Sequence, residues 1–349
     1  MATHLLERLG IRHPIVQAPM AGGITTPELV AAVAEAGALG SIGAPTYSAA
    51  EIAAAAEAVR RLTSRPFAIN LFIPLPAAES DPVAIARVAP ILRSFRAELG
   101  LPLEPPPPRA PEGFDAQFEA VLRAGPPVFS FTMGILEPER VRALHEAGTF
   151  IIGTANTADE AEALEESGVD AVCAQGAEAG GHRGAFLAPP DASMVGTMAL
   201  VRQAVQRVKV PVLAAGGIMD GAGIAAALAL GAQAAQMGTA FLSAAEAGTA
   251  AGHREALLSP DARHTVITRA FSGRQARTIR NRFTDALAGD DVPPFPLHAA
   301  MTADIRAAAA KQGRRDLMSM FAGQGAPLSR AMSAGQLVAT LAREAVERA

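Results

Sequence analysis

The stretch AQGAEAGGHRG, residues 174–184, places His182 inside a run that contains four glycines and three alanines. So many glycines disfavour a helix, and the run lacks the alternation of a half-buried strand, so a loop is expected. Glycine also lets another molecule approach the main chain closely. An imidazole, with an ordinary pKa of about 6.5, suits proton transfer at neutral pH. The stretch therefore predicts either an ordinary turn histidine or a general base beside a ligand.

Polar side chains and small residues stand where short apolar runs end elsewhere in the chain. Polar amides that point inward at such places are costly unless they bind something. An amide carries both a donor and an acceptor, which matches the alternating carbonyl and N–H groups of an isoalloxazine ring. The candidates at these run ends are Ala18, Pro19, Met20, Asn70, Ser130, Thr132, Gln175, Ala215, Gln236 and Met237.

Two further apolar runs end in glycine, at AAGGI (214–218) and QMGTAF (236–241), and a helical pattern follows each. Barrels of alternating strands and helices often bind a phosphate on backbone N–H groups after their last two strands. Gly216, Gly217, Gly238 and Thr239 fit such a site, with simple turn use of the glycines as the alternative. A phosphate site, amides for a ring edge and His182 together predict FMN binding beside a base. The first strand lacks a Gly-x-Gly-x-x-Gly sequel and the histidines lack paired ligand spacing, so neither a Rossmann site nor a metal is expected.

The elements that would position these residues are short apolar runs that alternate with helical patterns. Continuous apolar runs between helices are typical of parallel strands, and eight of them close a (β/α)8 TIM barrel. A doubly wound open sheet is the alternative. One helix is expected to begin at Thr26-Pro27 and stop at Gly37, and another to stop at Gly168. Strands are predicted at 14–19, 38–43, 67–72, 128–133, 149–154, 170–175, 211–216 and 234–239.

The strand pattern ends near residue 245, and this divides the chain. We expect an FMN-binding barrel at 1–245, with 74–113 as a decorated loop insertion whose prolines at 105–108 are extended and solvated. Residues 246–325 are expected to form a helical cap over the barrel mouth, and 326–349 a helix that packs back on the barrel. The arginines of TRAFSGRQARTIRNRF (268–283) are interpreted as a solvated helix face with ion pairs to acidic helices.

Composition argues against several classes of partner. The net charge is −4 and the pI is about 6.0, so nucleic acid is not expected. Cys173, the single cysteine, cannot form an internal disulfide and is interpreted as an inert core residue of a cytoplasmic protein. Early charges and the interrupted Ala-rich stretch at 221–242 argue against a signal peptide and a membrane span. These features are compatible with a homodimer.

The motifs QAPMAGG (17–23), NLF (70–72), AQGAEAGGHRG, AAGGI and QMGTAF, in this order, resemble the nitronate monooxygenase family, in its bacterial class I branch. FSGR-x-AR-xx-RNRF (271–283) and AGQGAPLSR (322–330) extend the resemblance from about residue 5 to the C-terminus. The resemblance implies non-covalent FMN and oxidation of alkyl nitronates, propionate 3-nitronate especially, by dioxygen to a carbonyl compound and nitrite. His182 would be the base for neutral nitroalkanes and a cationic partner for the nitronate. FMN would be held by Met20, Asn70, Gln175, Gly180, Gly217, Gly238 and Thr239, with Gly181 in the same loop.

The chain departs from this family at one place. Class I members usually show YP-x-QN where this chain reads FPLHA (295–299), and its single tyrosine is Tyr47. A tyrosine of the substrate pocket is therefore absent, which leaves the substrate open. Phe295, His298, Ser130 and Thr132 are candidates for substrate contacts, with a structural role in the cap as the alternative for His298.

Two other functions fit a similar scaffold. One is an FMN-dependent NAD(P)H reductase of a quinone or an enoyl thioester, because such relatives share the glycine-rich histidine loop. The other is a non-enzymatic barrel that senses FMN or a phosphate ligand. The small molecules expected for the first hypothesis are a nitronate or nitroalkane and dioxygen.

Overall fold

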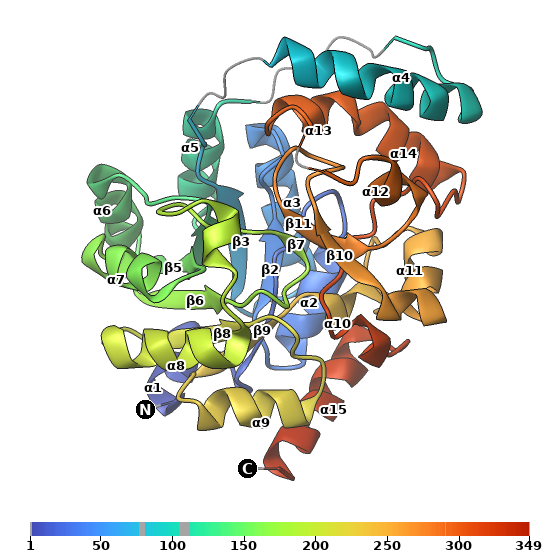
Figure 1. Cartoon of the computed structure of the whole chain (residues 1–349). Coiled ribbons are helices and arrows are strands. Elements are labelled where there is room, and N and C mark those ends of the chain that lie inside the picture. The colour runs from blue at the N-terminus through green and yellow to red at the C-terminus, as the bar shows by residue number, and fades with distance from the viewer. Residues whose placement is uncertain (1, 77–80, 105–111, 290, 349) are drawn as a thin grey trace.

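A computed structural model describes residues 2–76, 81–104, 112–289 and 291–348, and eight parallel strands form its centre (Figure 1). The last strand pairs with the first, and a bridge between Val16 and Leu39 joins the first strand to the second. The sheet is therefore closed, so the predicted TIM barrel is confirmed and the open sheet is excluded. The strands are β1 (Ile15–Gln17), β2 (Gly40–Gly43), β3 (Phe67–Phe72), β4 (Val128–Thr132), β5 (Phe150–Ala155), β6 (Ala171–Gln175), β8 (Val212–Ala215) and β9 (Ala234–Met237).

Alternation along the strands fills the barrel and also supplies its mouth. Val128 and Cys173 belong to the hydrophobic cluster inside the barrel, which helix α1 (Ala2–Leu9) closes at one end. Side chains two residues apart lie on the same face of a strand, so Ser130 and Gln175 follow them at the carboxyl edge. Burial raises the pKa of the Cys173 thiol to about 12, which confirms its predicted role as an inert core residue. The same alternation places Asn70, Thr132, Ala215 and Gln236 at this edge.

Helices cover the outside of the barrel and begin and end where the sequence predicts. The Thr26 hydroxyl accepts the Leu29 N–H at 3.1 Å, and Gly37 turns the chain with a φ of +91°. Gly168, with a φ of +93°, likewise follows the end of another helix. The outer helices are α2 (Pro27–Glu35), α3 (Ala49–Leu62), α5 (Phe114–Ala124), α6 (Pro138–Glu146), α7 (Ala158–Glu166), α8 (Thr197–Arg207) and α9 (Gly221–Ala229), and the short α10 (Thr239–Leu242) follows β9.

The region after residue 245 differs from the all-helical expectation, because it contains two strands. β10 (Thr265–Thr268) and β11 (Ala276–Ile279) pair antiparallel, and β11 also pairs with β7 (Gly181–His182) in the glycine-rich loop. The β-branched run TVIT is a strand signal that the alanine-rich surroundings obscured. The predicted arginine-bearing helix over 268–283 is therefore wrong, because most of this segment is a turn and a strand that pairs with the histidine loop.

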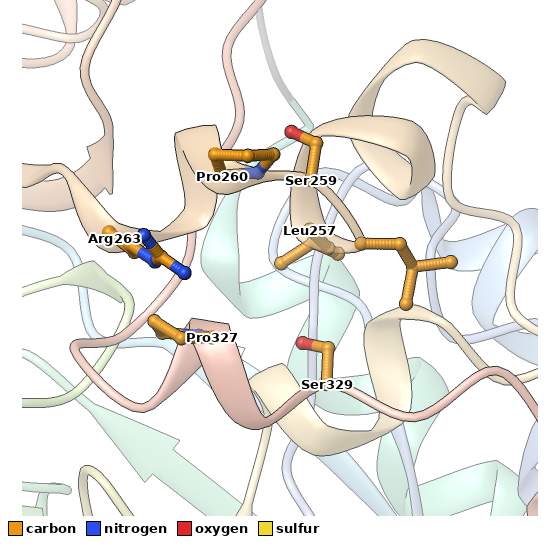
Figure 2. A pocket seen from close by; sticks show the side chains of 7 residues that line it. Leu257, Ser259, Pro260, Arg263, Pro327 and Ser329 are labelled. Carbon is orange, nitrogen blue, oxygen red and sulfur yellow. The ribbon is translucent and has the colours of Figure 1, made fainter.

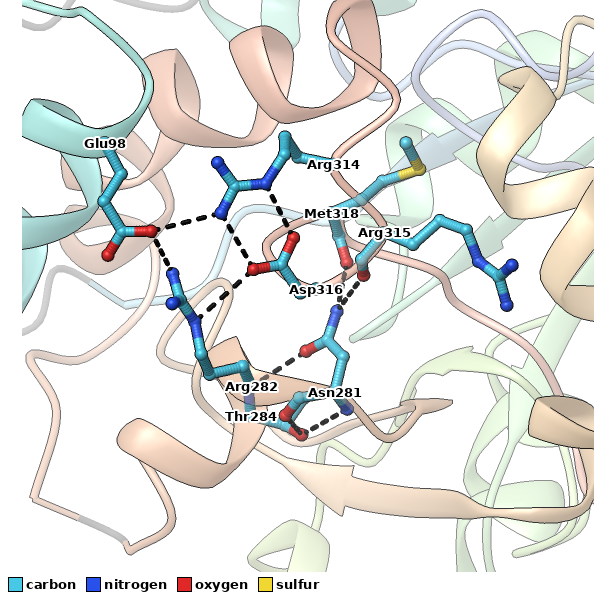
Figure 3. Close-up of polar contacts among 8 residues, drawn as sticks. All are labelled: Glu98, Asn281, Arg282, Thr284, Arg314, Arg315, Asp316 and Met318. Carbon is cyan, nitrogen blue, oxygen red and sulfur yellow. Dashed lines mark hydrogen bonds and ion pairs between the residues drawn. The ribbon is translucent and has the colours of Figure 1, made fainter.

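A second hydrophobic core joins the insertion to the cap (Figure 1). Its residues come from α4 (Pro82–Glu98), α11 (Ala251–Leu257), α12 (Arg282–Ala286) and α14 (Ala303–Lys311). Polar contacts reinforce this union: Glu98 at the end of α4 accepts hydrogen bonds from Arg282 and Arg314, and Asp316 accepts from Arg314 (Figure 3). The helix of the loop insertion therefore packs as part of the cap.

The C-terminal helix α15 (Ala334–Val346) returns to the barrel and lies beside α2 and α9 (Figure 1). Its Leu337, Val338 and Leu341 are buried in the barrel's outer core. Among the residues described above, no helix combines the length and apolarity that a membrane crossing needs. The prolines at 105–108 lie outside the described residues.

Candidate active site

Strand pairing delivers His182 to the mouth of the barrel. His182 lies opposite Ala276, and Gly181 lies opposite Arg277, in the register of β7 with β11. The loop that follows the end of β6 at Gln175 thus becomes a strand again at Gly181, six residues later. The structure therefore replaces the expected irregular loop around His182 with a short sheet shared with the cap.

Three phenylalanine rings surround the imidazole. The ring centroids of Phe72, Phe295 and Phe321 lie 6.3, 6.0 and 5.4 Å from that of His182. Phe72 ends β3, whereas Phe295 and Phe321 belong to the region after residue 245, so barrel and cap both contribute to this wall. His182 and all three rings are partly exposed. The three rings therefore form an apolar surface beside the imidazole of His182. Of these rings, the sequence predicts only Phe295 as a site residue.

The side chain of Gln175 hydrogen-bonds the loop that carries His182. Its Oε1 accepts hydrogen bonds from Asn156 Nδ2 at 2.8 Å and from the Gly184 N–H at 3.1 Å. Its Nε2 donates to the His182 carbonyl at 3.1 Å. These contacts use one of the two N–H donors of this amide. Gln175 therefore positions the histidine, and one donor remains for the predicted cofactor.

Three arginines hold the backbone of the same loop. Arg183, 1% exposed, donates to the carbonyls of Gly176 at 2.6 Å and of Gln175 and Ser193 at 3.1 Å. Arg274 donates to the Arg183 carbonyl at 3.0 Å, and Arg277 to the Ala177 carbonyl at 2.9 Å. Buried backbone carbonyls need hydrogen-bond donors, and a loop has no helix or sheet partner to supply them. The three guanidinium groups supply those donors here. The solvated helix face predicted for Arg274 and Arg277 is therefore corrected, although Arg282 does pair with the acidic end of α4.

The environment of His182 keeps its imidazole neutral. Burial, together with the positive charges of Arg274 and Arg306, lowers its pKa to about 4. The sequence predicted an unperturbed value, but apolar rings and two cations both disfavour an imidazolium. In the ligand-free protein at neutral pH, the imidazole of His182 is therefore uncharged.

Glycines and free N–H groups lie at the ends of β8 and β9. A Cβ on Gly238 would lie 3.5 Å from Ala18 Cβ and 3.8 Å from Met20 Sδ, which is ordinary van der Waals contact. Gly217, exposed and with a φ of +72°, turns the chain at the end of β8. Unpaired backbone donors that share a concave surface are suited to an anion. Within the described chain, no protein acceptor bonds the backbone N–H of Gly180, Gly217, Gly238 or Thr239.

The structure also places the candidates for the ring edge. Asn70, 4% exposed, donates from Nδ2 to Ser130 Oγ at 2.9 Å. The Met237 side chain is buried in the outer core and its carbonyl accepts the Ala18 N–H at 2.9 Å, so this residue has little left for a ligand. The candidates that remain partly exposed at the mouth are Ala18, Pro19, Met20, Thr132, Gly181, Gly216 and Gln236.

His298 lies in the scaffold and not against a substrate. It is fully buried in α13 (Leu297–Met301), and its Nε2 lies 2.7 Å from the Ala270 carbonyl. The carbonyl can only accept, so Nε2 carries the proton. This placement corrects its candidacy for substrate contact and agrees with the structural role weighed as the alternative.

We expect the free energy of unfolding to fall when the pH is lowered from about 6.5 towards 5. Burial lowers the pKa of both His253 and His298 to about 4, whereas a histidine in an unfolded chain has its ordinary pKa of about 6.5. Between these values the unfolded chain binds more protons, so acid favours it. Thermal unfolding at pH 7.5, 6 and 5 measures the slope. His298→Gln, whose amide can still donate to Ala270, should flatten it, and equal slopes for both proteins would contradict this account.

A separate hollow of about 340 Å³ lies between η2 (Pro260–Arg263) and η3 (Ala326–Leu328) (Figure 2). Its walls combine apolar side chains with the Arg263 guanidinium. None of the residues predicted for the site lines it, so it is distinct from the barrel mouth. The lining residues are Leu257, Leu258, Ser259, Pro260, Arg263, Pro327 and Ser329.

Comparison with known proteins agrees with this architecture. The family model described as nitronate monooxygenase matches residues 3–344. A curated relative from Staphylococcus aureus, "Probable nitronate monooxygenase", is 40% identical over 97% of this chain and 95% of its own. A solved nitroalkane oxidase from Streptomyces ansochromogenes is 41% identical, with a TM-score of 0.93, and the match covers 99% of this chain and 98% of that one. FabK from Thermotoga maritima is 30% identical with a TM-score of 0.77, over 99% of this chain and 96% of its own. The chain belongs to the nitronate monooxygenase family and is an oxidoreductase of that type.

Proposed function

We propose that this enzyme uses FMN to oxidise alkyl nitronates, of the propionate 3-nitronate type, with dioxygen to a carbonyl compound and nitrite. The observation that carries the proposal is the mouth of the barrel itself. A neutral imidazole lies among three aromatic rings, and unpaired N–H groups lie at the ends of β8 and β9. A base, an apolar surface and an anion site are the parts that such a reaction requires.

The residues present fit FMN. The N–H groups of Gly180, Gly217, Gly238 and Thr239 would hold its phosphate, and the glycine at position 238 adds no side-chain atoms beside its N–H. Asn70 and Gln175, with Ala18 to Met20, would lie along the ring. The chemistry that FMN supplies when bound is electron transfer from the nitronate to dioxygen.

The protein's own residues would prepare the substrate. His182 would take the α-proton of a neutral nitroalkane, which leaves a nitronate beside the newly formed imidazolium. The negative charge of the nitronate then stabilises the imidazolium that burial disfavours. The rings of Phe72, Phe295 and Phe321 would exclude water and contact the alkyl part.

Phe295 points to the kind of substrate. It stands where the class I pattern has tyrosine, and its ring lacks the hydroxyl that could bond a polar substituent. A pocket wall without hydrogen-bond donors discriminates weakly among apolar substituents of the substrate and forms no hydrogen bond with a polar substituent. We therefore propose nitronates with short apolar chains as good substrates, whereas the carboxylate of propionate 3-nitronate would gain no hydrogen bond from this ring.

Anaerobic mixing tests the function and separates it from the reductase alternative. The purified protein should contain flavin, and a nitronate should bleach its visible absorbance rapidly, whereas NADH or NADPH should not. On admission of air, nitrite should form in proportion to nitronate consumed. Rapid bleaching by NADH with no nitrite would instead favour the reductase, and a colourless protein that takes up no FMN would exclude both.

A further inference from the structure

Ser272 contacts the predicted base directly, from 90 positions further along the chain. Its Oγ lies 2.8 Å from His182 Nε2, and its side chain is buried, at 4% exposure. The residue belongs to the turn between β10 and β11, so the same sheet that positions the histidine also brings the serine to it. Sequence reasoning quoted the FSGR motif but assigned this serine no role.

The three hydrogen-bond contacts of the Ser272 hydroxyl decide whether Ser272 Oγ or His182 Nε2 donates in the contact between them. Its Oγ lies 3.2 Å from the Arg274 carbonyl and 3.3 Å from the Arg274 N–H. The hydroxyl has one proton to donate and two lone pairs with which to accept. All three contacts are satisfied only when the hydroxyl donates to the carbonyl and accepts from both the Arg274 N–H and His182 Nε2–H. With the hydroxyl turned to Nε2 instead, two oxygens would face each other without a proton between them.

The turn that carries Ser272 is itself anchored. His298 Nε2 donates to the carbonyl of Ala270 at 2.7 Å, and Thr302 Oγ1 donates to the carbonyl of Phe271 at 2.6 Å. Both donors are fully buried. The two residues before Ser272 are therefore fixed to α13 and to the start of α14, which holds the serine hydroxyl in one place.

We propose that Ser272 is a positioning residue that holds His182 as the Nε2–H tautomer, so that Nδ1 is the atom that accepts the substrate proton. This rests on the proposed function of His182 as a base. Among the described residues Nδ1 has no hydrogen-bond partner, which leaves its lone pair free. In the step itself, Nδ1 takes the α-proton, and the C–H electron pair moves into the nitro group to form the nitronate. Nε2–H stays bonded to Ser272 throughout.

Among the described residues, Ser272 is the one hydrogen-bond partner of the His182 ring. Arg274 and Arg306 are the cations that act on the imidazole, and both disfavour the imidazolium. The rings of Phe72, Phe295 and Phe321 offer neither donor nor acceptor of ordinary strength. Ser272 is therefore the contact that distinguishes Nε2 from Nδ1.

Nitrogen NMR of the purified protein labelled with ¹⁵N-histidine tests the tautomer without turnover. The chain has seven histidines, and the spectrum of His182→Asn identifies the signals of His182 by their loss. At pH 7.5 we expect Nε2 to carry the proton and Nδ1 to appear as an acceptor nitrogen. A protonated Nδ1 in the wild-type protein would overturn the proposal, whether or not the protein oxidises nitronates.

The kinetics of Ser272 variants are a second test of the positioning role. Ser272→Ala should lower kcat/KM for a neutral nitroalkane by at least about tenfold, because the imidazole then populates both tautomers. The value for a pre-formed nitronate should change by less than about threefold, since no proton is removed, and Ser272→Thr should restore most of the loss. Ser243→Ala is the matched control, because Ser243 is equally buried and its hydroxyl bonds the Arg330 carbonyl at 2.9 Å. Equal losses on both substrates would refute the positioning role.

Discussion

His182→Asn should keep FMN bound and lose about 10²- to 10⁴-fold in kcat/KM for a neutral nitroalkane, the range that a general base contributes. Asparagine cannot accept a proton at neutral pH, yet it retains a polar group of moderate size beside Ser272. The loss for a pre-formed nitronate should be smaller, because that substrate has already lost its proton. Nitrite release measured with both forms of one nitroalkane gives the two values on the same enzyme preparation.

His145→Asn is the matched control for this variant. His145 lies on α6, exposed, with its Nε2 3.1 Å from an Asp170 oxygen, and has no contact with the barrel mouth. It should behave as wild type on both substrates. If His182→Asn turned over the neutral nitroalkane normally, the imidazole would have no part in proton removal, and the Nδ1 proposal would fail with it.

The barrel was predictable from the sequence because each of its strands is a continuous apolar run. Runs such as FAINLF (67–72) and DAVCAQ (170–175) are buried on both faces, so local composition and final environment agree. Helix limits were equally local, because Thr26 caps a helix and Gly37 ends one through their own chemistry. Such features need no knowledge of distant residues.

The cap was not predictable in the same way, because its stability comes from partners far apart in the chain. The strand at 276–279 contains Arg277 and is followed by Arg280, so it reads as part of a polar helix until its pairing with residues 181–182 is known. Arg277 is buried because a loop carbonyl 100 positions away needs a donor. Similarly, Phe321 and Ser272 reach His182 only through this sheet, and neither is marked by local pattern.

Gly238→Ala should weaken FMN binding by at least about tenfold, or about 1.4 kcal/mol, without destabilising the flavin-free chain. Gly238 has an ordinary φ of −98°, and an added Cβ would meet its neighbours at 3.5 Å or more, so the protein itself accommodates the methyl group. Replacing glycine at such a position reduces the freedom of the unfolded chain and raises stability by up to about 1 kcal/mol. Affinity and stability should therefore move in opposite directions. Gly217 would not serve, since its φ of +72° makes any side chain strained.

Gly113→Ala is the matched control for Gly238→Ala. Gly113 also has an ordinary φ, of −62°, and an added Cβ there would meet no atom within 4 Å among the described residues. Titration of flavin-free protein with FMN, followed by flavin fluorescence, should give wild-type affinity for Gly113→Ala and a weaker one for Gly238→Ala. Thermal unfolding of both variants without flavin shows whether a loss of FMN affinity comes from the added methyl group at the site or from a destabilised fold. Wild-type FMN affinity in Gly238→Ala would place the phosphate elsewhere, because a methyl group at the end of β9 cannot share its space with a bound ligand.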